Sequence, residues 1–187
     1  MRHLLVISAL TLGLSSPCWA QEEREDKAFI GVRAVDLEFR TSHATREDNM
    51  AGAELVLGSH ITDYVRVELR LGTGLGDIQL EEELTAEVKG YASWYMGPQY
   101  PITENLWVYG LLGFSFIKGD TERADPDSYP EYPDKFYDSS FSFSYAAGFD
   151  YRLFGNWYGN FEFGRINRDS QTKLRTMQLG LGIKYEF

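Results

Sequence analysis

The stretch Thr172 to Phe187, TKLRTMQLGLGIKYEF, decides the fold of this chain. From Met177 onward, apolar residues alternate strictly with small or polar residues. The apolar set is Met177, Leu179, Leu181, Ile183, Tyr185 and Phe187, and the set between them is Gln178, Gly180, Gly182, Lys184 and Glu186. Successive side chains of a β-strand point to opposite faces, so this strand has one continuous apolar face and one small or polar face. The pattern predicts the wall of a narrow barrel, with the apolar face toward lipid and the small face inward.

Residues 1–20 predict a cleaved signal peptide and are left out of the fold. Arg2 and His3 precede an apolar run from Leu4 to Leu14, and Cys18 to Ala20 ends on the small residue expected at a cleavage site. We expect cleavage before Gln21, which leaves residues 21–187 as one outer-membrane barrel domain. A membrane anchor is the alternative, but the run is shorter than the roughly 20 apolar residues that a spanning helix needs.

The composition of the mature chain limits its partners. Loss of Arg2 leaves 17 basic and 28 acidic residues, a formal charge of −11. Such an acidic chain is not expected to bind nucleic acid, because that affinity comes from cations that neutralise phosphates. Removal of Cys18 leaves no cysteine, so no disulfide can form. Aromatic residues at 15% and 18 glycines favour strands with aromatic girdles over a helical fold.

Seven further strands are predicted before the terminal one. They cover residues 28–39, 51–59, 64–71, 84–96, 106–117, 140–152 and 157–166. Turns are expected at His60 to Asp63, Pro98 to Asn105 and Leu153 to Asn156, and connections of about ten residues or more after the first, third and fifth strands. Short turns at one end and long loops at the other are typical of outer-membrane barrels. The fold class is therefore all-β, an eight-stranded antiparallel up-and-down transmembrane β-barrel.

Charged residues on the small or polar faces predict a network inside the barrel. Arg66, Glu68 and Arg70 share one face of the third strand, and an arginine facing lipid costs roughly 2 to 4 kcal/mol at the bilayer midplane. We expect these side chains to point inward and to meet partners from neighbouring strands. The predicted lumen network is Glu54, Arg66, Glu68, Arg70, Glu87, Lys89 and Glu162. Such a network would fill an eight-stranded barrel, either as structural pairs or as an ion path.

Two strands have a facing that the alternation does not settle. In the first, Ile30, Val32 and Ala34 share one face, whereas Val35 and the apolar residues after it share the other. A bulge near Ala34 would bring both sets to one side. The fifth strand, 106–117, is apolar almost throughout, so its facing stays open.

These features resemble the small eight-stranded outer-membrane barrels of the OmpA/OmpX group. The signal segment, the eight strands and the terminal Leu181, Ile183, Tyr185 and Phe187 carry the resemblance. It implies that those four residues are the signal read by the barrel-assembly machinery. It also implies a monomer in the outer membrane of a Gram-negative cell, in contact with lipid and lipopolysaccharide. The fold itself hosts adhesins, stability proteins and lipid-modifying enzymes, so it leaves the function open.

The connection Gly119 to Ser139 is the candidate contact region. It combines acidic residues, tyrosines and three prolines, and the residues expected to make contact are Asp120, Asp125, Asp127, Tyr129, Tyr132, Asp134 and Tyr137. Tyrosine gives a large contact area with few rotatable bonds, and proline limits the entropy lost on binding. The segment would recognise a host or neighbouring surface, hold Ca²⁺, or serve as a solvated acidic cap. Its spacing does not match an EF-hand loop.

We expect a non-enzymatic protein, without cofactor or metal, in a structural or adhesion-like surface role. One alternative is a lipid A-modifying barrel enzyme, for which His43 beside Ser42 and Glu47 would be the candidate, although no enzyme motif surrounds it. A narrow porin-like channel is a second alternative. A soluble lipocalin-like barrel, with its apolar side chains inside, is a third.

Overall fold

The computed structural model describes residues 23–40, 48–81, 84–123, 140–168 and 175–187. The predicted signal peptide and the boundary at Gln21 lie outside these ranges. The described residues form strands β1 (Ala28–Arg40), β2 (Asp48–Thr62), β3 (Val65–Gly74), β4 (Asp77–Glu81), β5 (Leu84–Thr103), β6 (Leu106–Arg123), β7 (Ser140–Phe154), β8 (Trp157–Arg168) and β9 (Arg175–Glu186). Within these ranges, no helix is long and apolar enough to cross a membrane.

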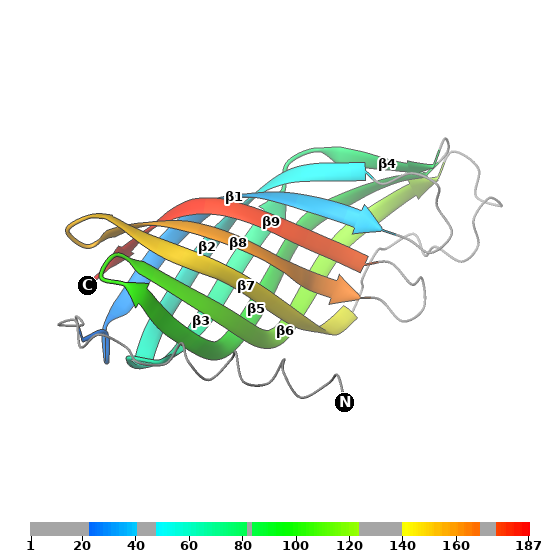
Figure 1. Ribbon diagram of the computed structural model, residues 1–187. Coiled ribbons are helices and arrows are strands. Elements are labelled where there is room, and N and C mark those ends of the chain that lie inside the picture. Colours follow the sequence, from blue (N-terminus) through cyan, green and yellow to red (C-terminus); the bar gives the residue numbers. More distant parts are fainter. Residues whose placement is uncertain (1–22, 41–47, 82–83, 124–139, 169–174) are drawn as a thin grey trace, which may run out of the picture.

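The strands close into one antiparallel barrel (Figure 1). Neighbours follow the order β3, β2, β1, β9, β8, β7, β6, β5, β4, and β3 also pairs with β5. β3 and β4 are two segments of a single wall strand, because both pair with β5, from Val65 opposite Pro98 up to Asp77 opposite Glu87. They are separated at Leu75 and Gly76, where Gly76 has a φ of 105° that favours glycine. The wall therefore has eight strands, which confirms the predicted fold class.

The two faces of the wall point as the alternation predicts. Phe143 is 49% exposed and Leu181 is 67% exposed on the outside, whereas Arg66 is 1% and Glu68 is 2% exposed on the inside. A soluble barrel with its apolar side chains inside would show the reverse. The lipocalin-like alternative is therefore wrong.

The first strand differs from its prediction. β1 pairs with β2 in unbroken register from Ala28 to Phe39, so the bulge expected near Ala34 is not formed. Val35 and Phe39 instead point inward and are buried. The inner wall is apolar at this height, and both apolar sets of β1 are accommodated, one outside and one inside. In β6, whose facing was open, Leu111 points inward and Leu112 outward.

Three two-residue turns lie at one end of the barrel, called the turn end. They join β2 to β3 through Asp63 and Tyr64, β5 to β6 through Glu104 and Asn105, and β7 to β8 through Gly155 and Asn156. The strands run further toward these turns than predicted. β5 continues through Pro98 and Pro101, although a turn was expected there. The strand shifts register next to Pro101, and such irregularities are where a strand tolerates proline.

The opposite end of the barrel is called the loop end. There the connection expected after the third strand is shorter than predicted, because β4 continues the pairing with β5 up to Glu81 and Leu84. β5 and β6, with 20 and 18 residues, are the longest described strands, and together with β4 they project beyond the rest of the wall (Figure 1).

Candidate functional site

The interior of the barrel carries balanced charge. Among the described residues, the buried cations are Arg24, Arg33, Arg66, Arg70 and Lys184, and the buried carboxylates are Glu54, Glu68, Asp150, Glu162 and Glu186. Five positive and five negative groups leave no net formal charge when all are ionised. Buried charges are stable only when each is paired and hydrogen-bonded, so the pairing of these groups decides what the lumen can do.

The part of the network nearest the turn end centres on Asp150. Its Oδ2 accepts from Arg66 Nη1 at 2.9 Å and also contacts Lys184 Nζ. Arg66 also pairs with Glu68, which in turn accepts from Arg70 Nε at 2.8 Å. Positive and negative groups thus alternate from β9 through β7 to β3.

The alternation continues toward the loop end through Glu162 of β8. Its two carboxylate oxygens accept from Arg70 at 2.6 and 2.7 Å, and Oε1 forms an ion pair with Arg33 Nη1 at 2.9 Å. Arg33 completes the chain by pairing with Glu54 of β2. A single series of ion pairs with alternating charges therefore links six strands of the wall, β9, β7, β3, β8, β1 and β2.

Neutral side chains satisfy the remaining carboxylate oxygens. Tyr91 and Gln178 donate to Glu54 Oε2 at 3.0 and 3.2 Å. Tyr109 donates to Glu162 Oε2 at 2.8 Å, and Asn160 donates to Asp150 Oδ1 at 2.8 Å. The carboxylates are therefore held by several donors each, as a rigid network requires.

A second group closes the turn end. Arg24, ahead of β1, is 1% exposed, and its guanidinium lies over the rings of Trp107 at 4.3 Å and Tyr158 at 4.7 Å. Arg24 Nη2 is 2.7 Å from Glu186 Oε2. Cation–π contacts and a buried carboxylate hold this arginine across the mouth of the lumen.

His60 lies beside this arginine and is fully buried in β2. Gln99 donates to His60 Nδ1 at 2.8 Å, and His60 Nε2 lies 3.1 Å from Glu186 Oε2. The same amide nitrogen of Gln99 donates to the Asp63 carbonyl at 3.0 Å. These partners define a neutral histidine whose Nε2 proton is donated to Glu186. His60 was expected to begin the turn His60 to Asp63, and that expectation is wrong because β2 extends to Thr62.

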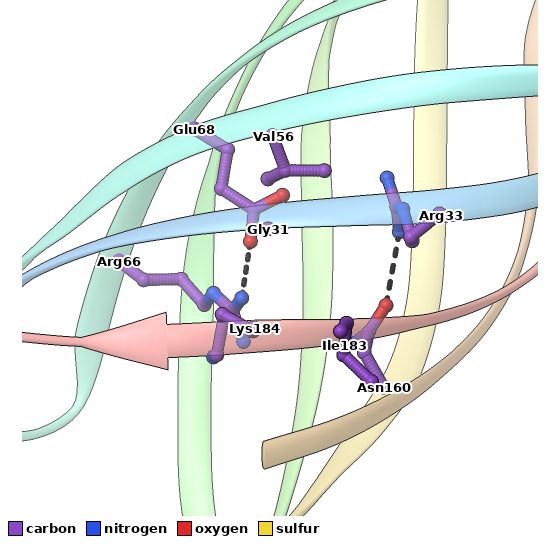
Figure 2. Close-up of a pocket in the computed structure, with 8 residues that line it drawn as sticks. All are labelled: Gly31, Arg33, Val56, Arg66, Glu68, Asn160, Ile183 and Lys184. Carbon is purple, nitrogen blue, oxygen red and sulfur yellow. Dashed lines mark hydrogen bonds and ion pairs between the residues drawn. The ribbon is translucent and has the colours of Figure 1, made fainter. Parts of the chain in front are cut away.

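Toward the loop end the described buried side chains are uncharged, and apolar residues lie among polar ones such as Ser142, Asn167 and Thr176. Val35, Leu37, Phe39, Met50, Val88 and Ile117 are buried there. Nearer the turn end, a cavity of about 10 Å³ lies between Arg33, Arg66, Glu68 and Lys184 (Figure 2). A cavity of that size holds about one water molecule. Figure 2 also shows the pairs Arg66–Glu68 and Arg33–Asn160 projecting into the same space from different strands.

The structure brings together five residues of the predicted network: Glu54, Arg66, Glu68, Arg70 and Glu162. Glu87 and Lys89 lie outside the lumen as exposed side chains, which corrects their predicted position. The register of β5 against β6 shifts between Val88 and Gly90, and one extra residue swaps the facing of everything beyond it.

The network also contains Arg33, Asp150 and Lys184, along with Arg24, His60 and Glu186, which were not among the predicted residues. Asp150, Lys184 and Glu186 stand on the small or polar faces of clearly alternating strands, so their position was available from the pattern. The inward position of Arg33 could not be predicted, because the alternation in β1 does not show which face is inward. The position of Arg24 could not be predicted from alternation either, because Arg24 precedes the first strand.

The aromatic residues divide between the two faces. Trp94, Tyr151 and Trp157 are exposed on the outside, as expected for interfacial girdles. Tyr95, Trp107, Tyr109 and Tyr158 also stand near strand ends, where girdle aromatics are expected, but they are buried in the lumen. Each of these side chains lies on the inward face of its strand. An aromatic residue can occupy either face, so the residue type alone does not predict which face it takes.

The remaining predicted residues fall into two groups. Leu181, Ile183 and Phe187 are exposed on the outer face, and the ring of Tyr185 packs 5.1 Å from that of Trp157. Their role as an assembly signal stays a prediction. Asp120 lies in β6 with its side chain outside the described set, and Asp125, Asp127, Tyr129, Tyr132, Asp134, Tyr137 and His43 lie outside the described residues. Within the described ranges, no three His, Cys, Asp or Glu residues are grouped as for a metal ion.

Comparison with known proteins identifies the family. The model of the outer membrane protein β-barrel domain matches residues 6–187. The chain belongs to this family. It is therefore an outer-membrane protein of a Gram-negative cell, with its apolar outer face in lipid. Because short turns face the periplasm in such barrels, the turn end is expected on that side. No curated protein matches the sequence.

Solved structures share the fold of this family member. Ail, the attachment invasion locus protein of Yersinia pestis, matches with a TM-score of 0.63 and 18% identity over 87% of this chain and 99% of Ail. Neisserial surface protein A matches with a TM-score of 0.62 and 12% identity over 87% of this chain and 100% of that one. OprG from Pseudomonas aeruginosa has a TM-score of 0.53 and 14% identity over 89% and 98% of the two chains. At these identities the likeness shows the fold.

Proposed function

We propose that this protein is a closed, non-conducting outer-membrane barrel that displays the segment between β6 and β7 for contact with a basic partner surface. The observation that carries the proposal is the filled lumen. The alternating chain of charges and the Arg24 closure occupy the space that an ion or solute would need. A barrel whose lumen is filled would act through the segments that it exposes outside the membrane.

Two features favour the β6–β7 segment as the contact region. β5 and β6 are the longest described strands at the loop end. β6 ends at Arg123, where the β6–β7 segment begins. Residues 124–139 contain five acidic residues and one basic residue, together with four aromatic residues. Such a segment fits a basic protein surface, because opposite charges steer encounter and aromatic side chains supply contact area. Ail has been crystallised with the heparin analogue sucrose octasulfate, but an acidic segment is expected to repel that polyanion.

Binding to epithelial cells tests the proposal directly. The protein is placed in fluorescent lipid nanodiscs, and the bound fraction is compared between wild type and the variant Asp125→Asn, Asp127→Asn, Asp134→Asn. We expect binding to fall at least about tenfold, because the electrostatic attraction is weakened. Sucrose octasulfate should also lower binding, because this polyanion competes with the acidic segment for the basic surface of the cells.

The matched control is a triple variant with the same change in charge at the turn end of the barrel. Glu23, Glu25 and Glu104 are exposed near the turn end, and replacing them with glutamine should leave binding unchanged. Equal loss of binding in both triple variants would show that total charge, and not the segment, is responsible, and would contradict the proposal.

The two alternatives have their own measurements. A planar bilayer should show no conductance steps from the wild-type protein, and regular steps would favour the narrow channel. Cells that lack the protein, or carry His43→Ala, should have an unchanged lipid A mass profile. Altered acyl chains would instead support a lipid A-modifying enzyme.

A further inference from the structure

The cavity of about 10 Å³ inside the lumen lies between two arginines of the charge network (Figure 2). Arg33 lines it from β1, and Arg66 lines it from β3. The two arginines are already connected by an open series of ion pairs, which runs from Arg33 through Glu162, Arg70 and Glu68 to Arg66. The cavity therefore separates two members of one series that have no direct contact with each other.

A glycine in the inner wall leaves room for this cavity. Gly31 pairs with Val56 on one side and with Lys184 on the other, and all three residues line the space. Phe29 and Arg33, the next residues on the same face of β1, are large and buried. Because Gly31 has no side chain between them, the wall is recessed at this point.

Each of the two arginines keeps one hydrogen-bond donor in reserve. The η nitrogens of Arg33 pair with Glu54 and Glu162, and those of Arg66 pair with two further carboxylates. Among the residues that the structure describes, the Nε atoms of both arginines are buried and have no hydrogen-bond partner. A buried donor without an acceptor is costly, and more so on a charged group. The cavity between these residues should therefore hold a hydrogen-bond acceptor.

The charges around the cavity indicate which kind of acceptor fits. The cations that line it are already paired, Arg33 with two glutamates and both Arg66 and Lys184 with Asp150. An added anion would be a buried charge without compensation, and it would meet the Glu68 carboxylate in the cavity wall. A water molecule is neutral, can both accept and donate, and has the size of this cavity.

We propose that one water molecule is bound here, accepts hydrogen bonds from Nε of Arg33 and of Arg66, and donates one to Glu68. Three partners are typical of a buried water molecule, which is then costly to remove. This water closes the open series of ion pairs into a ring that joins β1, β3 and β8. It is a fixed part of the network, and the proposal does not depend on the surface-contact role.

NMR spectroscopy of the protein in detergent micelles, with isotope-labelled arginine, tests this proposal. The Nε protons of Arg33 and Arg66 should both show dipolar cross-peaks to water, with the sign of a long-lived bound molecule and not of proton exchange. Val56→Ile adds a methyl group to the cavity wall and should abolish both cross-peaks, because it displaces the water. Val32→Ile adds the same group to the outer face of β1, where Val32 is 54% exposed, and should retain both.

The gel shift between unheated and boiled protein shows whether each variant is folded. The wild-type spectrum is informative even if Val56→Ile does not fold, because absence of both cross-peaks would mean a dry cavity and would overturn the proposal. Equal cross-peaks in folded Val56→Ile and wild type would place the water elsewhere and would overturn it as well. Crystals grown in bromide test for an anion. An anomalous scattering peak between Arg33 and Arg66 would show that an anion occupies the cavity in place of water.

Discussion

At the scale of single residues, the interior is fitted together by aromatic side chains that lie over glycines on the next strand. Tyr91 pairs with Gly72 and Tyr109 pairs with Gly148. A Cβ added to Gly72 would lie 2.1 Å from Tyr91 Cζ, and one at Gly148 would lie 2.6 Å from the Tyr109 hydroxyl. The same relation holds between Phe29 and Gly58 and between Tyr95 and Gly113. Tyr91 and Tyr109 also donate to Glu54 and Glu162, so these glycines let the rings reach the network.

Gly72→Ala is therefore expected to destabilise the folded barrel by about 1 to 3 kcal/mol, the usual effect of overpacking. The alanine would displace the Tyr91 ring and weaken its hydrogen bond to Glu54. Urea unfolding in lipid vesicles measures the change. Gly110→Ala, where a Cβ meets no atom, should leave the free energy of unfolding unchanged or slightly higher. Similar losses in both variants would show that the ring–glycine contact is not responsible.

Glu162 is the residue on which the charge network most depends, because it accepts hydrogen bonds from Arg70 and Tyr109 and forms an ion pair with Arg33. We expect Glu162→Ala to reduce the free energy of unfolding by about 3 kcal/mol, since removal of one partner leaves buried charge uncompensated. The same urea experiment measures it. The exposed Glu87 provides the control, and Glu87→Ala should stay within about 0.5 kcal/mol of wild type. A Glu162→Ala variant as stable as that control would show that the network is not structural.

At the scale of elements, the segment ahead of β1 behaves as a seal for the turn end. The amides of Arg24 and Glu25 donate to Asp63 Oδ1 at 2.6 and 3.1 Å. Asp26 N donates to the His60 carbonyl, and His60 N donates to the Lys27 carbonyl, both at 2.9 Å. These bonds lay the segment along the β2–β3 turn and direct the Arg24 side chain into the lumen.

Arg24→Ala should release this seal. Loss of the two cation–π contacts is expected to cost about 1 to 2 kcal/mol, because they are buried. The amides of Asp26 and His60 should then exchange with solvent at least about tenfold faster in a hydrogen-exchange experiment. Glu25→Ala keeps the backbone bonds and removes only an exposed side chain, so protection should be retained. Unchanged exchange in Arg24→Ala would mean that the backbone bonds alone hold the segment.

At the scale of the whole molecule, closure depends on the pairing of the first strand with the last. β1 pairs with β9 from Phe29 opposite Glu186 to Arg40 opposite Arg175. At its end, Ala28 and Phe187 exchange backbone hydrogen bonds of 3.1 and 2.9 Å. The Phe187 side chain itself is 65% exposed and contributes little packing within the barrel. Its expected role therefore belongs to biogenesis.

Phe187→Ala separates assembly from stability. The backbone bonds to Ala28 persist, so the free energy of unfolding should change by less than about 1 kcal/mol. Insertion into vesicles that contain the barrel-assembly machinery should slow, while insertion into plain vesicles should not. Leu153→Ala, which removes another exposed apolar side chain near the turn end, should insert at the wild-type rate in both. A normal rate for Phe187→Ala with the machinery would disprove the assembly signal.

The wall of the barrel could be predicted from the amino-acid sequence. Strict alternation in Val65 to Leu71, Ser140 to Arg152 and Met177 to Phe187 fixes which side chains face lipid, because the two faces of a strand are set by the backbone alone. The number of wall strands, the outward apolar face and the inward position of Arg66, Glu68 and Glu162 follow from that local rule.

The contacts inside the lumen could not be predicted in this way, because they depend on how distant strands pair. The bulge that turns Glu87 and Lys89 outward and the straight course of β1 that brings Arg33 inward depend on register between strands. The closure by Arg24 joins a segment ahead of the first strand to Glu186 at the end of the last, with Trp107 and Tyr158 between them. These contacts span most of the chain, and no local period encodes them, because they exist only once the sheet has closed on itself.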